Sequence, residues 1–169
     1  MKQAGHADSD ARNALKCELA TEVLRSFGSL RFAATGWSML PTVWPGDTLV
    51  VDRVGQDQVR IGDVVLVGRE GSLRAHRIIG TDGDPDNPQW ITKGDALPKP
   101  DRPVTGNELL GRVTYLIREG KLIPLPAELS GVESLVARVI RRSIPAARAL
   151  VYMHRIRQTP EESTLPCQG

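Results

Sequence analysis

The feature that most constrains the fold of this chain is a series of short apolar segments between residues 29 and 126. Each segment is rich in Val and Ile and is flanked by Gly, Pro, Asp or Asn, a pattern that favours antiparallel strands joined by turns. Aromatic residues make up only 4% of the chain, so aliphatic side chains must form most of the core. The sequence therefore predicts a mainly β domain over residues 29–126. Its expected strands are Ser29–Ala34, Thr48–Val54, Asp63–Val67, Arg74–Ile79, Gln89–Lys93, Leu109–Ile117 and Lys121–Pro124.

Three kinds of turn separate these strands. Pro45–Asp47 and Ile61–Asp63 each precede an apolar segment, which predicts a turn that leads into a strand. Gly80–Pro88 is polar and rich in Gly, Pro, Asp and Asn, so we expect an exposed loop at the end of a hairpin. Arg118–Gly120 is expected to turn the last hairpin.

Helical patterns flank the β domain on both sides. Apolar residues recur at helical spacing before Gly28, which predicts a helix from about Asp10 that is capped by Gly28, after a disordered lead over residues 1–9. After the β domain, residues 127–157 are expected to be helical, with a break at Pro145. The tail over 158–169 is expected to be disordered.

The charge distribution argues against nucleic-acid binding, since the net charge is only +2. Residues 138–157 are the exception, because they contain several arginines and no acid. Two interpretations of residues 132–157 stay open: a peripheral contact with a membrane, or a helix that packs on the domain and leaves its arginines in solvent.

The two cysteines, Cys17 and Cys167, show neither a CxxC motif nor zinc-ligand spacing, so we expect no metal and no cofactor. Two free thiols in a reducing compartment and a disulfide between the two ends both remain open. The start of the chain is polar, and no apolar run of membrane-spanning length follows it. We therefore expect a cytoplasmic protein, with membrane attachment, if any, from the surface.

Four polar residues are candidates for a catalytic site. Ser38 lies before Pro41 in a predicted turn, His76 is the only histidine of the β domain, and Asp95 and Asp101 share one loop. A serine needs a base to become a nucleophile, a neutral imidazole can accept its proton, and a carboxylate can orient that imidazole. Taken alone, each of these residues is more often structural.

These residues occur in motifs that resemble the S26 signal peptidases and, more distantly, the LexA-like peptidases. The matching segments are G-W-S-M-L-P-T-V-W-P-G-D at 36–47, I-G-D-V-V-L-V at 61–67, A-H-R-I-I-G at 75–80, T-K-G-D at 92–95 and L-L-G-R-V at 109–113. The resemblance covers about half of the chain and implies an antiparallel signal-peptidase-like β fold. It also implies a serine endopeptidase that cleaves a peptide or protein bound in extended form, after a small side chain.

The resemblance assigns roles to individual residues. It implies Ser38 as nucleophile and His76 as general base, as in the archaeal and endoplasmic-reticulum branch, where His replaces the more common Lys. Asp101 is favoured as the partner of His76, while Asp95 either shares that role or orders the loop. The backbone N–H of Ser38 is the expected oxyanion donor, since Gly36 stands where many relatives carry a hydroxyl. Lys93 is a less favoured base.

Two other functions remain alternatives. The domain could be a non-catalytic binding or regulatory module that keeps the fold, in which case Ser38, His76 and an aspartate need not form a hydrogen-bonded line. It could also be a LexA-like self-cleaving regulator, although residues 1–28 leave room for only one helix ahead of the β domain.

Overall fold

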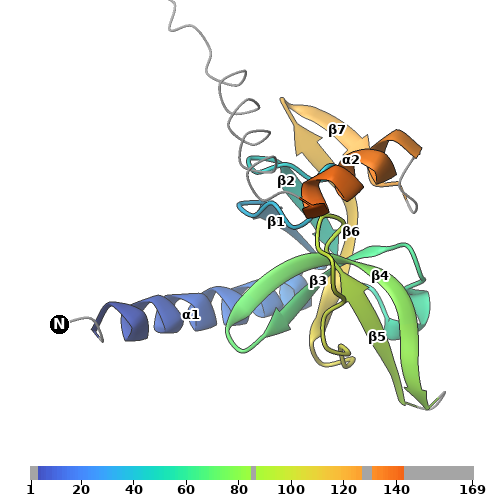
Figure 1. Cartoon of the computed structure of the whole chain (residues 1–169). Coiled ribbons are helices and arrows are strands. Elements are labelled where there is room, and N and C mark those ends of the chain that lie inside the picture. The colour runs from blue at the N-terminus through green and yellow to red at the C-terminus, as the bar shows by residue number, and fades with distance from the viewer. Residues whose placement is uncertain (1–3, 85–86, 127–130, 143–169) are drawn as a thin grey trace, which may run out of the picture.

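The computed structural model describes residues 4–84, 87–126 and 131–142, and within them the expected mainly β fold is confirmed. One antiparallel sheet is preceded by a long helix and followed by a short one (Figure 1). The elements in chain order are α1 (Ala4–Phe27), β1 (Ser29–Ala33), β2 (Thr48–Asp52), a 3₁₀ turn at Gln56–Gln58, β3 (Val64–Arg69), β4 (Ser72–Asp84), β5 (Asn87–Lys93), β6 (Leu109–Arg118), β7 (Lys121–Pro124) and α2 (Gly131–Arg142).

The strand order is β1-β2-β6-β3-β4-β5, and β7 pairs with β6. The long strand β6 has β2 along one edge, opposite residues 112–117. Its other edge is shared by β3, opposite 109–112, and by β7, opposite 115–118. Register shifts occur within β2, β3 and β4, and such bulges bend and twist a sheet. The sheet therefore curves and buries apolar side chains on both of its faces.

Two large apolar clusters form most of the core, and the alternation of β3 separates them. Val64 and Leu66 belong to the first cluster, whereas Val65 and Val67 belong to the second. Successive residues of a strand point to opposite faces, so the two clusters lie on opposite sides of the sheet. A strand that is buried on both faces needs a continuous apolar run, and V-V-L-V at 64–67 supplies one.

Helix α1 ends where the sequence predicts but begins earlier. Gly28 adopts a positive φ of 74° and donates its N–H to the Leu24 carbonyl at 3.0 Å, which closes the helix. The helix starts at Ala4, so the expectation of a disordered lead is wrong for residues 4–9, and residues 1–3 lie outside the described part. The sequence from Ala4 to Asp10 contains no proline to stop a helix. Only the C-terminal half of α1 lies beside the sheet, where Ala20 and Leu24 are buried (Figure 1).

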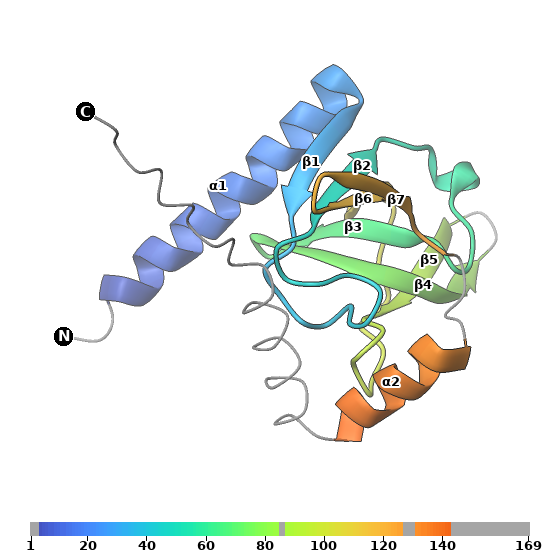
Figure 2. The same ribbon diagram turned by 90° about the horizontal axis from the view of Figure 1, so that it is seen from above.

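Helix α2 lies at the end of the sheet away from α1 (Figure 2). Ala137 and Ile140 are buried, and Ile140 packs in a small cluster with Leu40 and Ala96. Leu135 and Val139 remain exposed. The expectations for residues 143–157 and 158–169 lie outside the described residues.

The expected loop at Gly80–Pro88 is shorter than the sequence suggested. Strand β4 continues to Asp84, and β5 begins at Asn87, so most of this segment is paired backbone. The pairing runs from Gly80 opposite Ile91 to Asp84 opposite Asn87. A polar composition marks this end of the hairpin as solvent-exposed, but it does not prevent the backbone from pairing. The turn expected at Arg118–Gly120 is present, with Glu119 and Gly120 at positive φ.

Neither described helix combines the length and the apolar character that crossing a bilayer would require.

Candidate active site

The loop between β1 and β2 carries Ser38, and its far end is fixed by an ion pair. Asp47 is buried and receives two hydrogen bonds from the Arg118 guanidinium, at 2.9 and 2.7 Å. Asp47 also accepts the backbone N–H of Trp44 at 2.7 Å, and Arg118 donates to the Thr42 carbonyl at 3.1 Å. The turn at Pro45–Asp47 thus ties the loop to strand β6 before the chain enters β2.

A second buried ion pair holds the middle of the same loop. Both oxygens of Asp95 accept hydrogen bonds from Arg77, each at 2.9 Å, and the Thr42 hydroxyl donates to Asp95 at 2.6 Å. Arg77 also donates to the Gly62 carbonyl at 2.8 Å. A bidentate pair between an arginine and a carboxylate fixes orientation as well as distance. Asp95 therefore links strand β4 to the Ser38 loop.

The backbone of Ser38 lies directly against the Gly94–Leu97 turn. The Ser38 carbonyl accepts the N–H of Ala96 at 2.8 Å. A Cβ atom on Gly94 would lie 2.6 Å from the same carbonyl oxygen. Only glycine permits this close approach, so the turn after β5 determines where Ser38 lies.

Strand β4 places His76 beside this loop. Alternation along β4 directs Arg74 and His76 to one face and Ala75 and Arg77 to the other. His76 is almost fully buried, with 4% of its surface exposed. Adjacent residues of one strand thus serve two purposes: Arg77 supports the scaffold and His76 faces Ser38.

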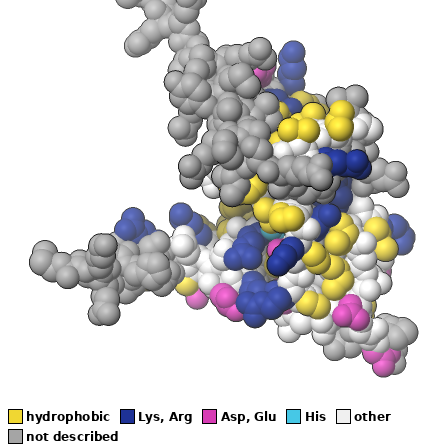
Figure 3. Space-filling view, viewed as in Figure 1, with side chains coloured by type: hydrophobic (Ala, Val, Ile, Leu, Met, Phe, Trp, Pro, Cys, Tyr) yellow, Lys and Arg dark blue, Asp and Glu magenta, His cyan; other side chains and the backbone are white. Residues whose placement is uncertain are grey.

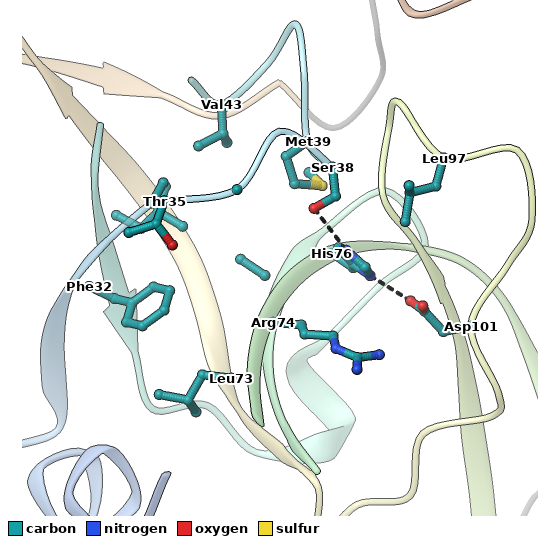
Figure 4. A pocket seen from close by; sticks show the side chains of 14 residues that line it. Phe32, Thr35, Ser38, Met39, Val43, Leu73, Arg74, His76, Leu97 and Asp101 are labelled. Atoms are coloured by element: carbon teal, nitrogen blue, oxygen red, sulfur yellow. Dashed lines mark hydrogen bonds and ion pairs between the residues drawn. The ribbon is translucent and has the colours of Figure 1, made fainter. Parts of the chain in front are cut away.

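Ser38, His76 and Asp101 form one hydrogen-bonded line (Figure 4). His76 Nε2 lies 3.1 Å from Ser38 Oγ, and His76 Nδ1 lies 2.6 Å from Asp101 Oδ2. With Nδ1 protonated and donating to the carboxylate, Nε2 is left as the acceptor for the serine hydroxyl. The serine, the histidine and the aspartate come from three separate segments of the chain.

Asp101 is held by strand β5. Its N–H donates to the Thr92 carbonyl at 2.8 Å, and the Thr92 hydroxyl donates to Asp101 Oδ2 at 2.8 Å. Burial raises the pKa of Asp101, but hydrogen bonds from His76 and Thr92 and the nearby charge of Arg74 outweigh it, so the pKa lies below its usual value. Asp101 is therefore a carboxylate at neutral pH and can stabilise a positive imidazolium.

A groove of about 350 Å³ lies next to the Ser38 hydroxyl. Its apolar lining comes from β1, β4 and the Ser38 loop, and includes Phe32, Ala34, Met39, Val43, Leu73 and Ala75. Residues Ser72–His76 pair with β3 along one edge only, because β5 pairs with β4 from Arg77 onward. The other edge of Ser72–His76 has no strand partner within the described residues, so it can accept an extended peptide.

The backbone N–H of Ser38 donates to no acceptor within the described part of the chain. It is therefore available to a negative oxygen that forms beside Ser38 Oγ. Thr35 and Gly36 also line the groove, and Gly36 provides no side-chain donor.

The structure brings three of the four candidate residues together and separates the fourth. Asp95 does not contact His76, because Arg77 and Thr42 occupy its oxygens, and this rules it out as the orienting carboxylate. Lys93 does not line the groove. It follows Thr92 on β5, and since Thr92 faces Asp101, alternation turns Lys93 away.

Sequence reasoning missed the supporting residues Thr92, Gly94 and Arg77. All three lie inside the motifs that resemble signal peptidases, yet only the fold shows that Thr92 binds Asp101, Gly94 lies against Ser38 and Arg77 binds Asp95. The available clue to Thr92 was its position near the end of β5, just before the loop that was expected to carry the two aspartates. Elsewhere, no three described His, Cys, Asp or Glu side chains lie close enough together to bind a metal ion.

Neither a protein-family model nor a curated protein matches this chain. Any inference about the chemistry of the site therefore has to come from its geometry. The Ser38 hydroxyl lies within hydrogen-bond distance of His76, and both lie beside the edge of Ser72–His76 that has no strand partner among the described residues.

Proposed function

We propose that this protein is a serine endopeptidase in which Ser38 is the nucleophile, His76 the general base and Asp101 the residue that orients His76. The single observation that carries the proposal is the line from Ser38 Oγ through His76 to Asp101, with separations of 3.1 and 2.6 Å. The resemblance of the motifs around these residues to signal peptidases points to the same reaction.

The proposed reaction begins with proton transfer from Ser38 Oγ to His76 Nε2 as the oxygen attacks the carbonyl carbon of a peptide bond. The tetrahedral oxyanion accepts a hydrogen bond from the Ser38 N–H. Its collapse breaks the C–N bond, and His76 returns the proton to the departing amine. Water, deprotonated by His76, then hydrolyses the acyl-enzyme and restores the Ser38 hydroxyl. Asp101 stays ionised throughout and stabilises the imidazolium.

The substrate binds as an added strand in this proposal. An extended peptide would pair with the free edge of Ser72–His76 and lie over the apolar groove, which brings its scissile carbonyl to Ser38. The groove is of a size to take small apolar side chains, and the resemblance implies a small residue before the cut.

The test is the cleavage of a random decapeptide library, read by mass spectrometry. We expect the wild-type protein to cut a subset of peptides, and Ser38→Ala and His76→Ala to lose this activity. Lys93→Ala and Ser26→Ala serve as matched controls, because neither residue lines the groove, and both should cut like the wild type.

Cleavage that survives Ser38→Ala would refute the mechanism. Cleavage that survives His76→Ala but not Lys93→Ala would move the base to lysine. A folded wild-type protein that cuts no member of the library would favour the non-catalytic module.

A further inference from the structure

Among the described residues that line the groove, Arg74 is a charged side chain without a hydrogen-bond or ion-pair partner. The charged side chains that line the groove are Arg74 and Asp101, and His76 lies near both. Asp101 is engaged by His76 and Thr92. Arg74 is exposed, and within the described part of the chain it forms no hydrogen bond or ion pair. Basic side chains also gather beside a small patch of histidine on the face shown in Figure 3.

The position of Arg74 places its charge beside the path of a bound peptide. Arg74 precedes His76 by two residues on β4 and points to the same face (Figure 4). Two residues of strand span about 7 Å. A peptide that pairs with the free edge of Ser72–His76 would therefore pass Arg74 within three residues of its scissile bond.

Arg74 does not serve to hold Asp101 in place. Their charges interact, and this lowers the pKa of Asp101, but the hydrogen bonds to that carboxylate come from His76 and Thr92. An arginine whose purpose was to hold Asp101 would be expected to pair with it directly. The five N–H donors of the Arg74 guanidinium are instead left for another acceptor.

We propose that Arg74 selects substrates that carry Asp or Glu within three residues of the scissile bond. This inference depends on the proposed peptidase function and names its substrate class. The guanidinium would bind the substrate carboxylate through two parallel hydrogen bonds while smaller side chains occupy the apolar part of the groove. Arg74 acts in binding and takes no part in bond cleavage.

The experiment uses pools of decapeptides with a central Ala–Ala pair. In each set of three pools, Asp, Asn or Lys is fixed at one of the four positions that flank the central pair. For the wild type, we expect kcat/KM to favour Asp over Asn by about tenfold at one position, mainly through KM. Arg74→Gln should remove the preference, Arg74→Lys should restore part of it, and Arg74→Glu should favour Lys at that position.

Arg60→Glu is the matched control for Arg74→Glu, because it makes the same charge change on an exposed residue outside the groove. It should keep the wild-type preference for Asp over Asn. Cleavage without a preference for Asp, or a preference that survives Arg74→Gln, would overturn the role of Arg74 and leave the peptidase proposal intact. An equal fall of kcat for every pool in Arg74→Gln would also overturn it, because Arg74 would then act only through Asp101.

Binding to Ser38→Ala separates this inference from the proposed reaction. Fluorescein-labelled peptides from the same pools are followed by anisotropy with Ser38→Ala and with Ser38→Ala/Arg74→Gln. If the wild type cuts nothing but Ser38→Ala binds Asp peptides in an Arg74-dependent way, acid recognition stands and the peptidase proposal fails. If there is neither cleavage nor Arg74-dependent binding, both are overturned.

Discussion

Asp101 is the residue whose charge matters most to the proposed chemistry. Replacement by Asn keeps its size and an acceptor for Thr92 but removes the charge that stabilises the imidazolium of His76. We expect Asp101→Asn to lower kcat by about 10³-fold or more, with little change in KM. The measurement is kcat on the best peptide from the library. Asp82→Asn, on the exposed hairpin of β4 and β5, is the control and should not alter kcat. A loss below tenfold for Asp101→Asn would contradict this role.

Gly94 should be as important as a catalytic side chain, although it has no side chain itself. A methyl group at Gly94 would lie 2.6 Å from the Ser38 carbonyl oxygen, so Ser38 or the Gly94 turn must move. We expect Gly94→Ala to lower kcat by about 10²-fold, because small displacements of a nucleophile are costly, and to destabilise the fold by about 1–3 kcal/mol.

The matched control for Gly94→Ala is Gly80→Ala, since a Cβ on Gly80 meets no atom within 4 Å. It should leave kcat unchanged. Peptide cleavage and urea denaturation of both variants provide the comparison, and wild-type activity in Gly94→Ala would show that the close contact does not position Ser38.

The motifs pointed to Ser38, His76 and the aspartate pair, and the resemblance favoured Asp101 as the partner of His76, but the sequence left a shared role for Asp95 open. The choice depends on Arg77, which takes both oxygens of Asp95. That pairing joins a strand to a distant loop, and nothing in local spacing reveals it.

Of the two α-helices, α2 is the one that packs against the loop that carries Ser38. Ile140 forms one buried cluster with Leu40 of the Ser38 loop and Ala96 of the Gly94–Leu97 turn. We expect Ile140→Ala to destabilise the protein by about 2–5 kcal/mol, because it opens a cavity at a fully packed contact. Leu135→Ala, on the exposed side of the same helix, should cost less than about 0.5 kcal/mol. Urea denaturation measures both values, and equal effects would show that α2 does not pack as described.

The positions of the strands were the most predictable feature of the secondary structure. Apolar segments flanked by turn residues located every strand of the described residues, since burial in the core requires apolar side chains. The ends were less predictable: β4 extends to Asp84, and α1 begins at Ala4. Polar residues there can continue an exposed hairpin or a solvated helix without any apolar signature.

For the whole molecule, a pH dependence of stability follows from a carboxylate that joins β3 to the start of β6. Glu108 binds Arg69, with Glu108 Oε2 2.7 Å from the guanidinium, and it accepts the Thr105 N–H at 2.9 Å. The hydrogen bond from Arg69 is the main reason that the pKa of Glu108 falls to about 2. A carboxylate with a lowered pKa stabilises the fold above its unfolded pKa, and this contribution disappears as the pH falls through the folded value.

We therefore expect Glu108→Gln to be less stable than the wild type near neutral pH and to match it at about pH 2. The difference should shrink as the pH falls below about 4.5, the ordinary range of a Glu pKa. Urea midpoints across this range test the prediction. Glu119→Gln, at the exposed turn between β6 and β7, should show no such trend. A difference that persists at pH 2 would indicate a cause other than ionisation.

Strand β4 has a consequence for protein engineering. It carries the proposed base His76, the Arg77 of a scaffold ion pair and an edge without a strand partner. Its half-buried groove positions, Leu73 and Ala75, take part in neither the proposed base nor the ion pair. Cleavage preference could therefore be redesigned at these two positions without rebuilding the catalytic line. The strand that carries the proposed base would then support a series of variants with different cleavage preferences.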